Sequence, residues 1–145
     1  MKTPKLIDIN LSVENDVAIA TLDRDDVRNA LTGTAMIEDI ISLCNWINSN
    51  HEIGAMVITG SGKAFSAGGN IKDMRDRKGD IFGGTPISQQ DGYRRGIQLM
   101  SQALYKLEVP LIAAVNGPAV GAGLDVICMC DIRFGCQYSK VGETF

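Results

Sequence analysis

Two glycine-bearing segments hold the residue types that could carry out chemistry in this chain. One spans residues 62–74, and the other holds Gly117, Gly121 and Gly123 ahead of a lone carboxylate, Asp125. Glycine lacks a Cβ, so another group can approach peptide N–H donors closely at such positions. The first turn of a helix also leaves N–H donors free. Two segments of this kind facing one another could direct two N–H groups at one oxygen, which is an oxyanion hole.

A simpler interpretation of either segment stays open, because glycines also permit tight turns and close helix packing. A nucleotide phosphate site is disfavoured. Neither segment has the G-x-x-x-x-G-K-[ST] or G-x-G-x-x-G spacing of a nucleotide-binding loop, and Lys63 after Gly62 is followed by alanine.

Asp125 likewise has two interpretations. A carboxylate among apolar residues tends to have a raised pKa, which suits acid/base chemistry. An acid in the first turn of a helix also complements the helix dipole, which would be a purely structural role. Asp131, the next acid along the chain, fits a structural cap or turn role better.

The elements that must position these groups alternate between strand and helix. Strand-like runs at 5–16 and 17–23, joined by a polar turn at 14–16, predict a hairpin. Apolar spacing predicts a helix from about 34 to 48, which Thr32 or Thr34 could cap. Further along we expect a strand at 55–60, a loop into a short polar helix at 61–80, a mobile surface loop at 78–90, a helix at 92–107, a strand at 111–115, a helix at 120–129 and a strand at 131–135.

Parallel strands joined through a helix put their carboxyl ends at one edge of a sheet, where ligands bind in open α/β folds. The strands at 55–60 and 111–115 are therefore expected to be parallel neighbours. Each would deliver one glycine-bearing segment to that edge.

Composition places limits on the function. The 145 residues suit one domain, 45% of them are hydrophobic and 21% charged, and the net charge of −3 gives no reason to expect a nucleic-acid or membrane partner. No apolar run is long enough for a membrane span, and the first residues lack the pattern of a signal peptide. Four cysteines without C-x-x-C spacing, and a single histidine, predict buried reduced thiols in a cytoplasmic protein.

Three segments, 17–32, 62–74 and 106–134, resemble the enoyl-CoA hydratase/isomerase family, also called crotonases, in order and spacing. The resemblance covers nearly the whole chain. It implies an α/β fold, a crotonase-like spiral of ββα-type turns with mostly parallel buried sheets. Family members are longer, so residues 1–145 would be the N-terminal core of a crotonase-like domain, truncated before the C-terminal helices.

The resemblance also implies a chemistry. Crotonases bind an acyl-CoA thioester and stabilise the enolate that forms when its carbonyl oxygen gathers charge. Ala67 would supply one N–H donor, and Ala122, at a position where the family usually has glycine, would supply the other. Coenzyme A enters as part of the substrate, and the resemblance implies no permanently bound cofactor and no metal.

Residues on the coenzyme A side follow from the same resemblance. Arg28 or Arg24 would contact the CoA phosphates, although a solvated charged loop is an equally open interpretation of either arginine, and of Lys72. The segment that lines the substrate site comprises Ala67, Gly68, Gly69 and Asn70.

The acids depart from the family pattern. Asp125 stands where hydratases have a glutamate, and aspartate occurs there in dienoyl-CoA isomerase relatives. Direct spacing puts the second acid at Phe145, and Glu143 would serve only after a shift of register.

The resemblance therefore favours enolate chemistry on an acyl-CoA, with an enoyl-CoA hydratase or isomerase as the leading expectation. A non-catalytic acyl-CoA-binding or oligomerising homologue is the alternative, as is a related decarboxylase, dehalogenase or thioesterase. For a full-length family member we expect a homotrimer or a dimer of trimers.

Overall fold

The main sheet begins with the expected hairpin. In the computed structural model, which describes residues 2–144, β1 (Ile9–Glu14) pairs antiparallel with β2 (Val17–Leu22). Asn15 and Asp16, between the strands, have φ angles of 48° and 65°. Two successive left-handed residues are typical of a type I′ turn, and Asn and Asp tolerate that backbone better than most residues. The predicted hairpin is confirmed.

The rest of the main sheet is parallel. Its strand order is β1-β2-β3-β4-β6, with β3 at Ala55–Gly60, β4 at Leu111–Val115 and β6 at Ile132–Gly135. Neighbouring pairs from β2 onward run parallel, so the prediction for β3 and β4 is confirmed. A second sheet pairs β5 (Ala119–Val120) in parallel with β7 (Val141–Gly142). The chain thus has an α/β fold with a mostly parallel sheet.

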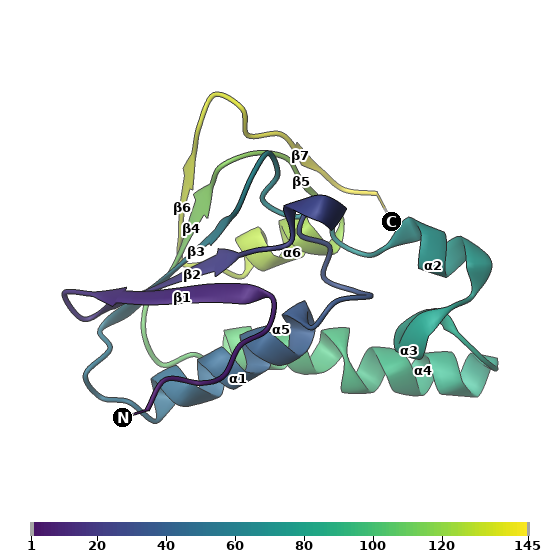
Figure 1. Cartoon of the computed structure of the whole chain (residues 1–145), viewed down its shortest axis with the longest axis horizontal. Helices are drawn as coiled ribbons and strands as arrows, with labels where there is room; N and C mark the ends of the chain where they lie inside the picture. Colours follow the sequence, from purple (N-terminus) through teal and green to yellow (C-terminus); the bar gives the residue numbers. More distant parts are fainter. Residues whose placement is uncertain (1, 145) are drawn as a thin grey trace.

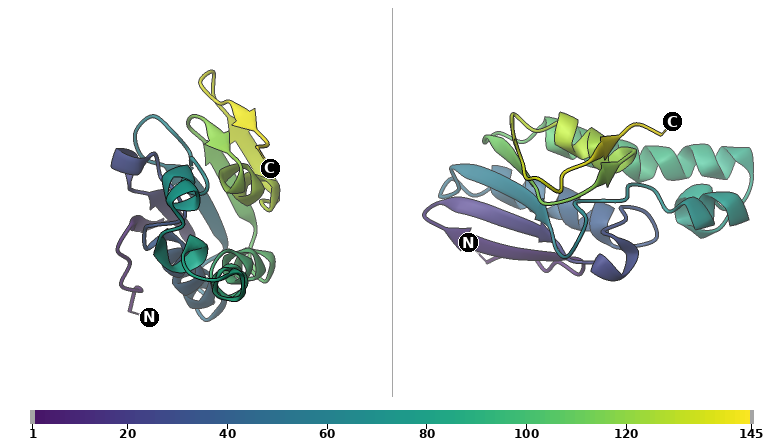
Figure 2. Two further views of the ribbon diagram at one scale, coloured as in Figure 1. Left: turned by 90° about the vertical axis from the view of Figure 1, so that its right-hand side faces the viewer. Right: turned by 90° about the horizontal axis from the view of Figure 1, so that it is seen from above.

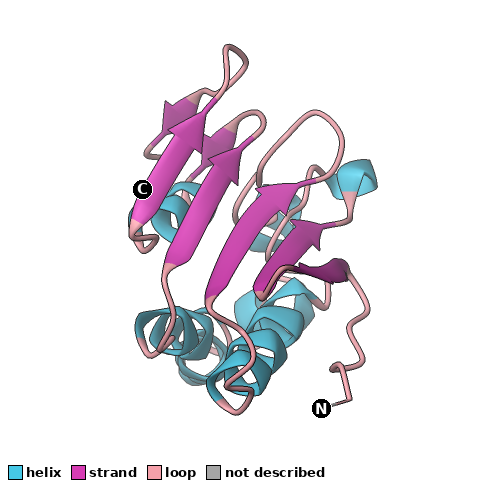
Figure 3. Cartoon of the chain, turned by 90° about the vertical axis from the view of Figure 1, so that its left-hand side faces the viewer, coloured by secondary structure: helices cyan, strands magenta, loops and turns pink. Residues whose placement is uncertain are grey.

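The helices lie on one side of the main sheet, as Figure 3 shows. Two of them, α1 (Met36–Asn48) and α5 (Ile97–Tyr105), pack side by side below the strands in Figure 1. A short 3₁₀ helix, η1 (Asp25–Val27), follows β2, and α6 (Ala122–Cys128) follows β5. The segment with α2 (Ile71–Asp76), α3 (Gly79–Phe82) and α4 (Pro86–Arg95) projects beyond the sheet (Figures 1 and 2). We call residues 71–95 the helical arm.

The core lies between the sheet and the helices. Strand β3 alternates, with Met56 and Ile58 fully buried and Val57 only half-buried between them. The opposite face of this strand is therefore less covered than its apolar sequence indicates. The largest fully buried side chains are Leu22, Leu31, Met36, Ile40, Leu43, Ile47, Met56, Ile58, Phe65, Met100, Leu111 and Val126.

The prediction of a mobile loop at 78–90 is wrong, because that range contains α3 and the first half of α4. The Thr85 hydroxyl accepts a hydrogen bond from the Ser88 N–H at 3.3 Å, and Pro86 occupies the first turn. A threonine cap followed by proline is a helix start signal. The glycines before it form the turn between two helices.

The helix predicted at 92–107 is also corrected, because it is divided at Gly96. That residue has φ −108° and ψ −101°, which ends α4 and begins α5. The helix predicted at 34–48 begins at Met36 instead, and its N-cap residue is Ala35, without a side-chain cap bond. The Thr34 hydroxyl nevertheless accepts the Met36 N–H at 3.3 Å. Thr32 bonds elsewhere, as described below.

Candidate active site

The two glycine-bearing segments lie against one another at the carboxyl ends of β3 and β4. The N–H groups of Phe65 and Ser66 both donate to the Pro118 carbonyl oxygen, at 2.9 and 3.2 Å. The Val120 N–H donates in return to the Ser66 carbonyl oxygen at 3.1 Å. These bonds, and the parallel bridge between Ser66 and Ala119, hold the segments in a fixed register.

Two of the glycines are required by this contact. Gly68 has φ +73°, and a Cβ there would collide with the Val120 carbonyl oxygen. A Cβ on Gly123 would lie 2.5 Å from the Ser66 carbonyl oxygen. At both positions the neighbouring backbone belongs to the opposite glycine-bearing segment. The close-packing interpretation therefore holds for both glycines.

The two candidate oxyanion donors differ in whether their N–H group already makes a hydrogen bond within the chain. Among residues 2–144 the Ala122 N–H has no hydrogen-bond partner, and Ala122 is buried in the first turn of α6. The Ala67 N–H, in contrast, donates to the Arg28 carbonyl oxygen at 2.9 Å. One expected donor is thus free, whereas the other is already satisfied within the chain.

The segment that carries Arg28 runs alongside the first glycine-bearing segment. Asn29 is fully buried, and its side-chain N–H groups donate to the carbonyl oxygens of Ser61 and Ala64 at 3.0 and 2.9 Å. The Ser66 hydroxyl donates to the Asn29 carbonyl oxygen at 2.7 Å, and the Leu31 N–H donates to the Gly68 carbonyl oxygen at 2.8 Å. Residues 28–31 therefore form one wall of the candidate site.

Thr32 continues that wall. Its hydroxyl accepts the Asn70 N–H at 2.7 Å, and the Asn70 side chain accepts the Lys72 N–H at 3.0 Å and so caps α2. Through these two hydrogen bonds, Asn70 links the wall at residues 28–32 to the helical arm. Sequence reasoning does not predict these roles for Asn29, Ser66 and Thr32, since each depends on a partner more than thirty residues away in the chain.

Asp125 lies on the first turn of α6, half-buried, three residues after Ala122. Burial raises the pKa of its carboxyl group, and the negative charge of Glu143 raises it further. The parallel pairing of β7 with β5 explains this proximity, because Glu143 directly follows β7 and Asp125 lies on the helix that follows β5. Two carboxylates therefore lie close together, one half-buried and one exposed.

Thr144 lies beside the start of α6. A Cβ on Gly121 would come within 3.2 Å of the Thr144 hydroxyl oxygen, and the Thr144 N–H donates to the Glu143 carboxylate at 2.9 Å. Phe145, where direct spacing put the second acid, lies outside the described residues. Asp131 has the structural role expected of it, since its carboxylate accepts the Leu111 N–H at 2.8 Å at the start of β4.

Comparison with known proteins identifies the family. Residues 12–145 match the model of the family described as enoyl-CoA hydratase/isomerase. The chain belongs to this family.

Its curated relatives carry hydratase names. The chain is 35% identical over 127 residues to a probable mitochondrial enoyl-CoA hydratase of Dictyostelium discoideum. The matched residues cover 88% of this chain and 42% of the relative. It is 30% identical over 142 residues to a short-chain-enoyl-CoA hydratase of Clostridium acetobutylicum, covering 96% of this chain and 50% of that one. The chain spans about half the length of these curated relatives.

Solved structures agree with the fold. An enoyl-CoA hydratase/carnithine racemase from Magnetospirillum magneticum superposes with a TM-score of 0.82 at 28% identity, over 96% of this chain and 50% of that one. An enoyl-CoA hydratase from Bacillus anthracis also gives 0.82, at 26% identity, over 95% and 51% of the two chains. The crotonase-like fold expected from the sequence is confirmed for this family member.

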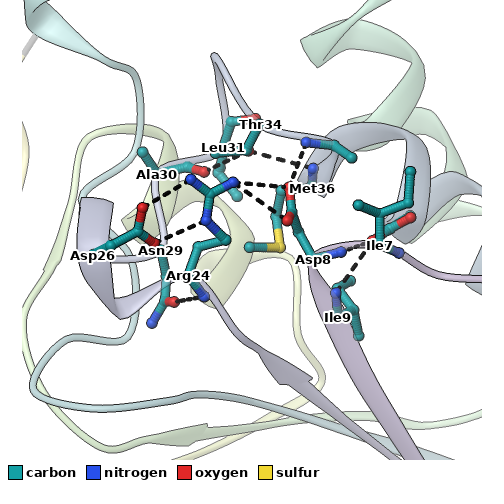
Figure 4. A network of polar contacts seen from close by, with 12 residues as sticks. Ile7, Asp8, Ile9, Arg24, Asp26, Asn29, Ala30, Leu31, Thr34 and Met36 are labelled. Carbon is teal, nitrogen blue, oxygen red and sulfur yellow. Dashed lines mark hydrogen bonds and ion pairs between the residues drawn. The ribbon is translucent and has the colours of Figure 1, made fainter.

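The two arginines expected on the coenzyme A side differ in their surroundings. Figure 4 shows the Arg24 guanidinium between two acids, with ion pairs of 2.8 Å to Asp26 and 3.3 Å to the buried Asp8. Hydrogen bonds from Arg24 lower the pKa of Asp26, and bonds to both acids raise the pKa of Arg24. Arg28 is more exposed and reaches Asp25 only at 4.0 Å. Of the two, Arg28 is the freer to meet a phosphate.

Asp8 and Asp39 join this arginine to the N-terminal segment. The Asp8 carboxylate accepts the Ala35 N–H at 2.6 Å, just before α1. The Asp39 carboxylate, buried on α1, accepts the N–H groups of Ile7, Asp8 and Ile9 at 2.6 to 3.1 Å. The network around Arg24 thus fixes β1 to α1, which is a structural role.

The cysteine prediction holds in part. All four thiols are free, but only Cys44 and Cys130 are buried, and burial raises the pKa of each to about 12. Cys128 and Cys136 are exposed, which corrects the expectation of four buried thiols. Hydrogen bonds from the Tyr138 N–H and the Ser139 hydroxyl lower the pKa of Cys136.

No helix among residues 2–144 is long and apolar enough to cross a membrane. The same residues contain no group of three or more side chains placed to bind a metal ion. The cytoplasmic location stays a prediction, and the name of the Dictyostelium relative is that of a mitochondrial protein.

Proposed function

We propose that this chain belongs to an enzyme that forms an enolate from an acyl-CoA thioester, acting as an enoyl-CoA hydratase or isomerase. The observation that carries the proposal is the half-buried Asp125 carboxyl group. Its pKa is raised by burial and by Glu143, and it lies one helical turn from the Ala122 N–H, which has no hydrogen-bond partner among the described residues 2–144. An acid with a raised pKa beside a free N–H donor suits proton transfer next to a developing oxyanion.

In this mechanism the thioester carbonyl oxygen accepts a hydrogen bond from the Ala122 N–H. Negative charge that gathers on the oxygen during enolate formation strengthens this bond, which lowers the barrier. Asp125 carries the proton to or from the α-carbon of the substrate. Glu143 takes the role of the second carboxylate, which direct spacing had given to Phe145.

Ala67 requires one further step to act as the second donor. Its N–H donates to the Arg28 carbonyl oxygen, so the substrate oxygen has to displace that carbonyl. The exchange replaces a neutral acceptor with one that gains negative charge, and hydrogen bonds to charged acceptors are the stronger ones. Gly68, Gly69 and Asn70 would line the bound thioester, with Arg28 toward the CoA phosphates.

A non-catalytic acyl-CoA-binding homologue is the second candidate. The bond between the Ala67 N–H and the Arg28 carbonyl favours it, because a chain that keeps this bond has one oxyanion donor instead of two. Both candidates bind an acyl-CoA, and they differ in turnover. Assembly into a homotrimer or a dimer of trimers is part of the proposal for the full-length protein.

The experiment is a hydration assay with a short unsaturated acyl-CoA, followed by the loss of its conjugated enone absorbance. Asp125→Asn should lower turnover by about 10²- to 10⁴-fold, since asparagine keeps the size of the side chain but transfers no proton. Binding of the ester, measured by calorimetry, should be largely retained. Glu14→Gln, at an exposed position on β1, is the control that should leave both unchanged.

Equal turnover in wild type and Asp125→Asn would remove Asp125 from the mechanism. Tight binding without turnover in the wild type, either as hydration of a 2-enoyl-CoA or as isomerisation of a 3-enoyl-CoA, would favour the non-catalytic homologue.

A further inference from the structure

The segment that follows β7 passes the start of α6. The Gly121 N–H donates to the Gly142 carbonyl oxygen at 3.0 Å, and Gly121 is the N-cap residue of α6, the helix that carries Asp125. Beyond Gly142, no backbone hydrogen bond joins residues 143–144 to the rest of the described chain. The strand pairing therefore delivers Glu143 and Thr144 to the start of α6, and other contacts have to hold them there.

The Thr144 side chain provides one such contact. Its hydroxyl oxygen would lie 3.2 Å from a Cβ on Gly121, and within the described part of the chain it is the one atom of another segment that comes within 4 Å of that position. Gly121 has φ +51°, a conformation that favours glycine, so no side chain of its own fills this space. Thr144 therefore lies over the N-cap of α6.

The backbone of Thr144 holds the neighbouring acid. Its N–H donates to the Glu143 carboxylate at 2.9 Å, and hydrogen bonds to a charged acceptor are the stronger ones. Within residues 2–144 this carboxylate makes no other hydrogen bond and no ion pair. The position of the Glu143 carboxylate therefore depends on where Thr144 is held.

This position matters for Asp125. The Asp125 N–H donates to the Gly121 carbonyl oxygen at 3.1 Å, so Asp125 lies one helical turn from the residue that Thr144 covers. Besides burial, the negative charge of Glu143 raises the pKa of Asp125. Coulomb repulsion falls with distance, so a Glu143 carboxylate that moved away would act less on Asp125.

We propose that Thr144 is a positioning residue, which holds the Glu143 carboxylate beside Asp125 so that the two acids act as a pair. The inference rests on the proposed function and adds to it the residue that brings the second carboxylate into place. Thr144 acts through Glu143 and transfers no proton itself. Its side chain anchors the segment on Gly121, and its N–H orients the carboxylate.

The first test measures the pKa of Asp125 by NMR titration and uses no substrate. Thr144→Gly keeps the backbone N–H but removes the side chain that covers Gly121, so the pKa of Asp125 should fall toward its value in Glu143→Gln. Thr144→Val is the matched control, because it keeps both the N–H and the shape of the side chain, and it should retain the wild-type pKa. An unchanged pKa in Thr144→Gly, or an equal fall in Thr144→Val, would overturn the proposal.

Thr144→Pro tests the backbone hydrogen bond. Proline has no N–H, so the Glu143 carboxylate loses the one donor it has among the described residues. The pKa of Asp125 should fall in this variant too, and a wild-type value would contradict the role of the N–H. Thr144 is exposed, so all three variants are expected to fold, which thermal unfolding verifies.

The last test connects Thr144 to the reaction. With a short enoyl-CoA, Thr144→Gly should lower kcat about tenfold or more and leave KM nearly unchanged, since a misplaced catalytic group costs rate rather than binding. Thr144→Val should restore turnover, and Glu14→Gln serves again as the remote control. Equal kcat in the wild type and Thr144→Gly would overturn the role of Thr144 in the reaction. If the wild type itself has no turnover, the proposed function fails, whereas the pKa measurements still decide whether Thr144 positions Glu143.

Discussion

Glu143 lies close enough to Asp125 for its negative charge to raise the pKa of the Asp125 carboxyl group. The two residues are eighteen positions apart and are brought together by the parallel pairing of β5 and β7. Glu143→Gln should therefore lower the pKa of Asp125, while burial keeps it above the usual value for aspartate. NMR titration of the Asp125 side-chain carbon measures this directly. An unchanged pKa of Asp125 in the variant would show that the charge of Glu143 does not act on Asp125.

The raised pKa has a consequence for stability. The folded state binds the Asp125 proton more tightly than the unfolded state does, so this group's contribution to stability is lost as pH rises from the usual aspartate pKa through the raised one. At neutral pH, Asp125→Asn should then increase the melting temperature while it lowers turnover. Thermal unfolding at pH 4 and pH 7 tests the sign, because the gain should be smaller at the lower pH. A variant that is less stable at pH 7 would contradict this account of Asp125.

The crossing of the two glycine-bearing segments makes Gly68 a sensitive position. Gly68→Ala combines a φ of +73° with a collision against the Val120 carbonyl oxygen, so we expect a loss of about 2 kcal/mol or more in the free energy of unfolding. Gly79→Ala is the matched control, because Gly79 has φ +77° but no atom of the described residues lies within 4 Å of the added Cβ. Its cost should be that of the backbone strain alone, about 1 kcal/mol. Equal costs in denaturant unfolding would show that the crossing contact is not tight.

Asp39 should matter for stability and leave the chemistry unchanged. Its buried carboxylate accepts three N–H groups of the N-terminal segment, and hydrogen bonds to a charged acceptor contribute more than neutral ones. Asp39→Ala should lower the free energy of unfolding by about 3 kcal/mol. The neighbouring Glu38→Ala, at an exposed position, is the control and should change it little. If both variants unfold at the same denaturant concentration, the Asp39 bonds contribute nothing measurable.

The thiols should react in a fixed order. Cys136 is exposed and has a lowered pKa, so a maleimide at neutral pH should modify it first, followed by Cys128. Cys44 and Cys130, with pKa values raised to about 12 by burial, should react only after unfolding. Peptide mass spectrometry over a time course reads the order, and denatured protein without reductant should show four free thiols. Early modification of Cys44 would contradict the buried position of its side chain.

The sequence predicts those parts of the fold that depend on local patterns. The turn at Asn15 and Asp16, the apolar runs of β3 and β4 and the crossover between them are all visible in the order of residue types. The helix break at Gly96, the short helix α3 and the start of α4 are not predicted, because a stretch rich in glycine and polar residues resembles a loop. There the Thr85 cap and Pro86 were the signals that could have identified α4.

The candidate site is predicted only in outline. The positions of Ala122 and Asp125 follow from the resemblance, but the satisfied Ala67 N–H depends on a carbonyl thirty-nine residues earlier, at Arg28. The proximity of Glu143 to Asp125 likewise depends on the pairing of two strands of two residues each. Strands of two residues are too short to show a periodic pattern, so they cannot be recognised in the sequence.

The central claim is that this chain stabilises an enolate with proton transfer by Asp125. Hydrogen–deuterium exchange at the α-carbon of butyryl-CoA tests it most directly, because exchange requires the enolate and does not depend on whether the full reaction is hydration or isomerisation. In deuterium oxide the wild type should catalyse incorporation of deuterium, seen by mass spectrometry, and Asp125→Asn should slow it by about 10²-fold or more. No exchange while the ester is bound, or equal exchange in the wild type and Asp125→Asn, would contradict the claim.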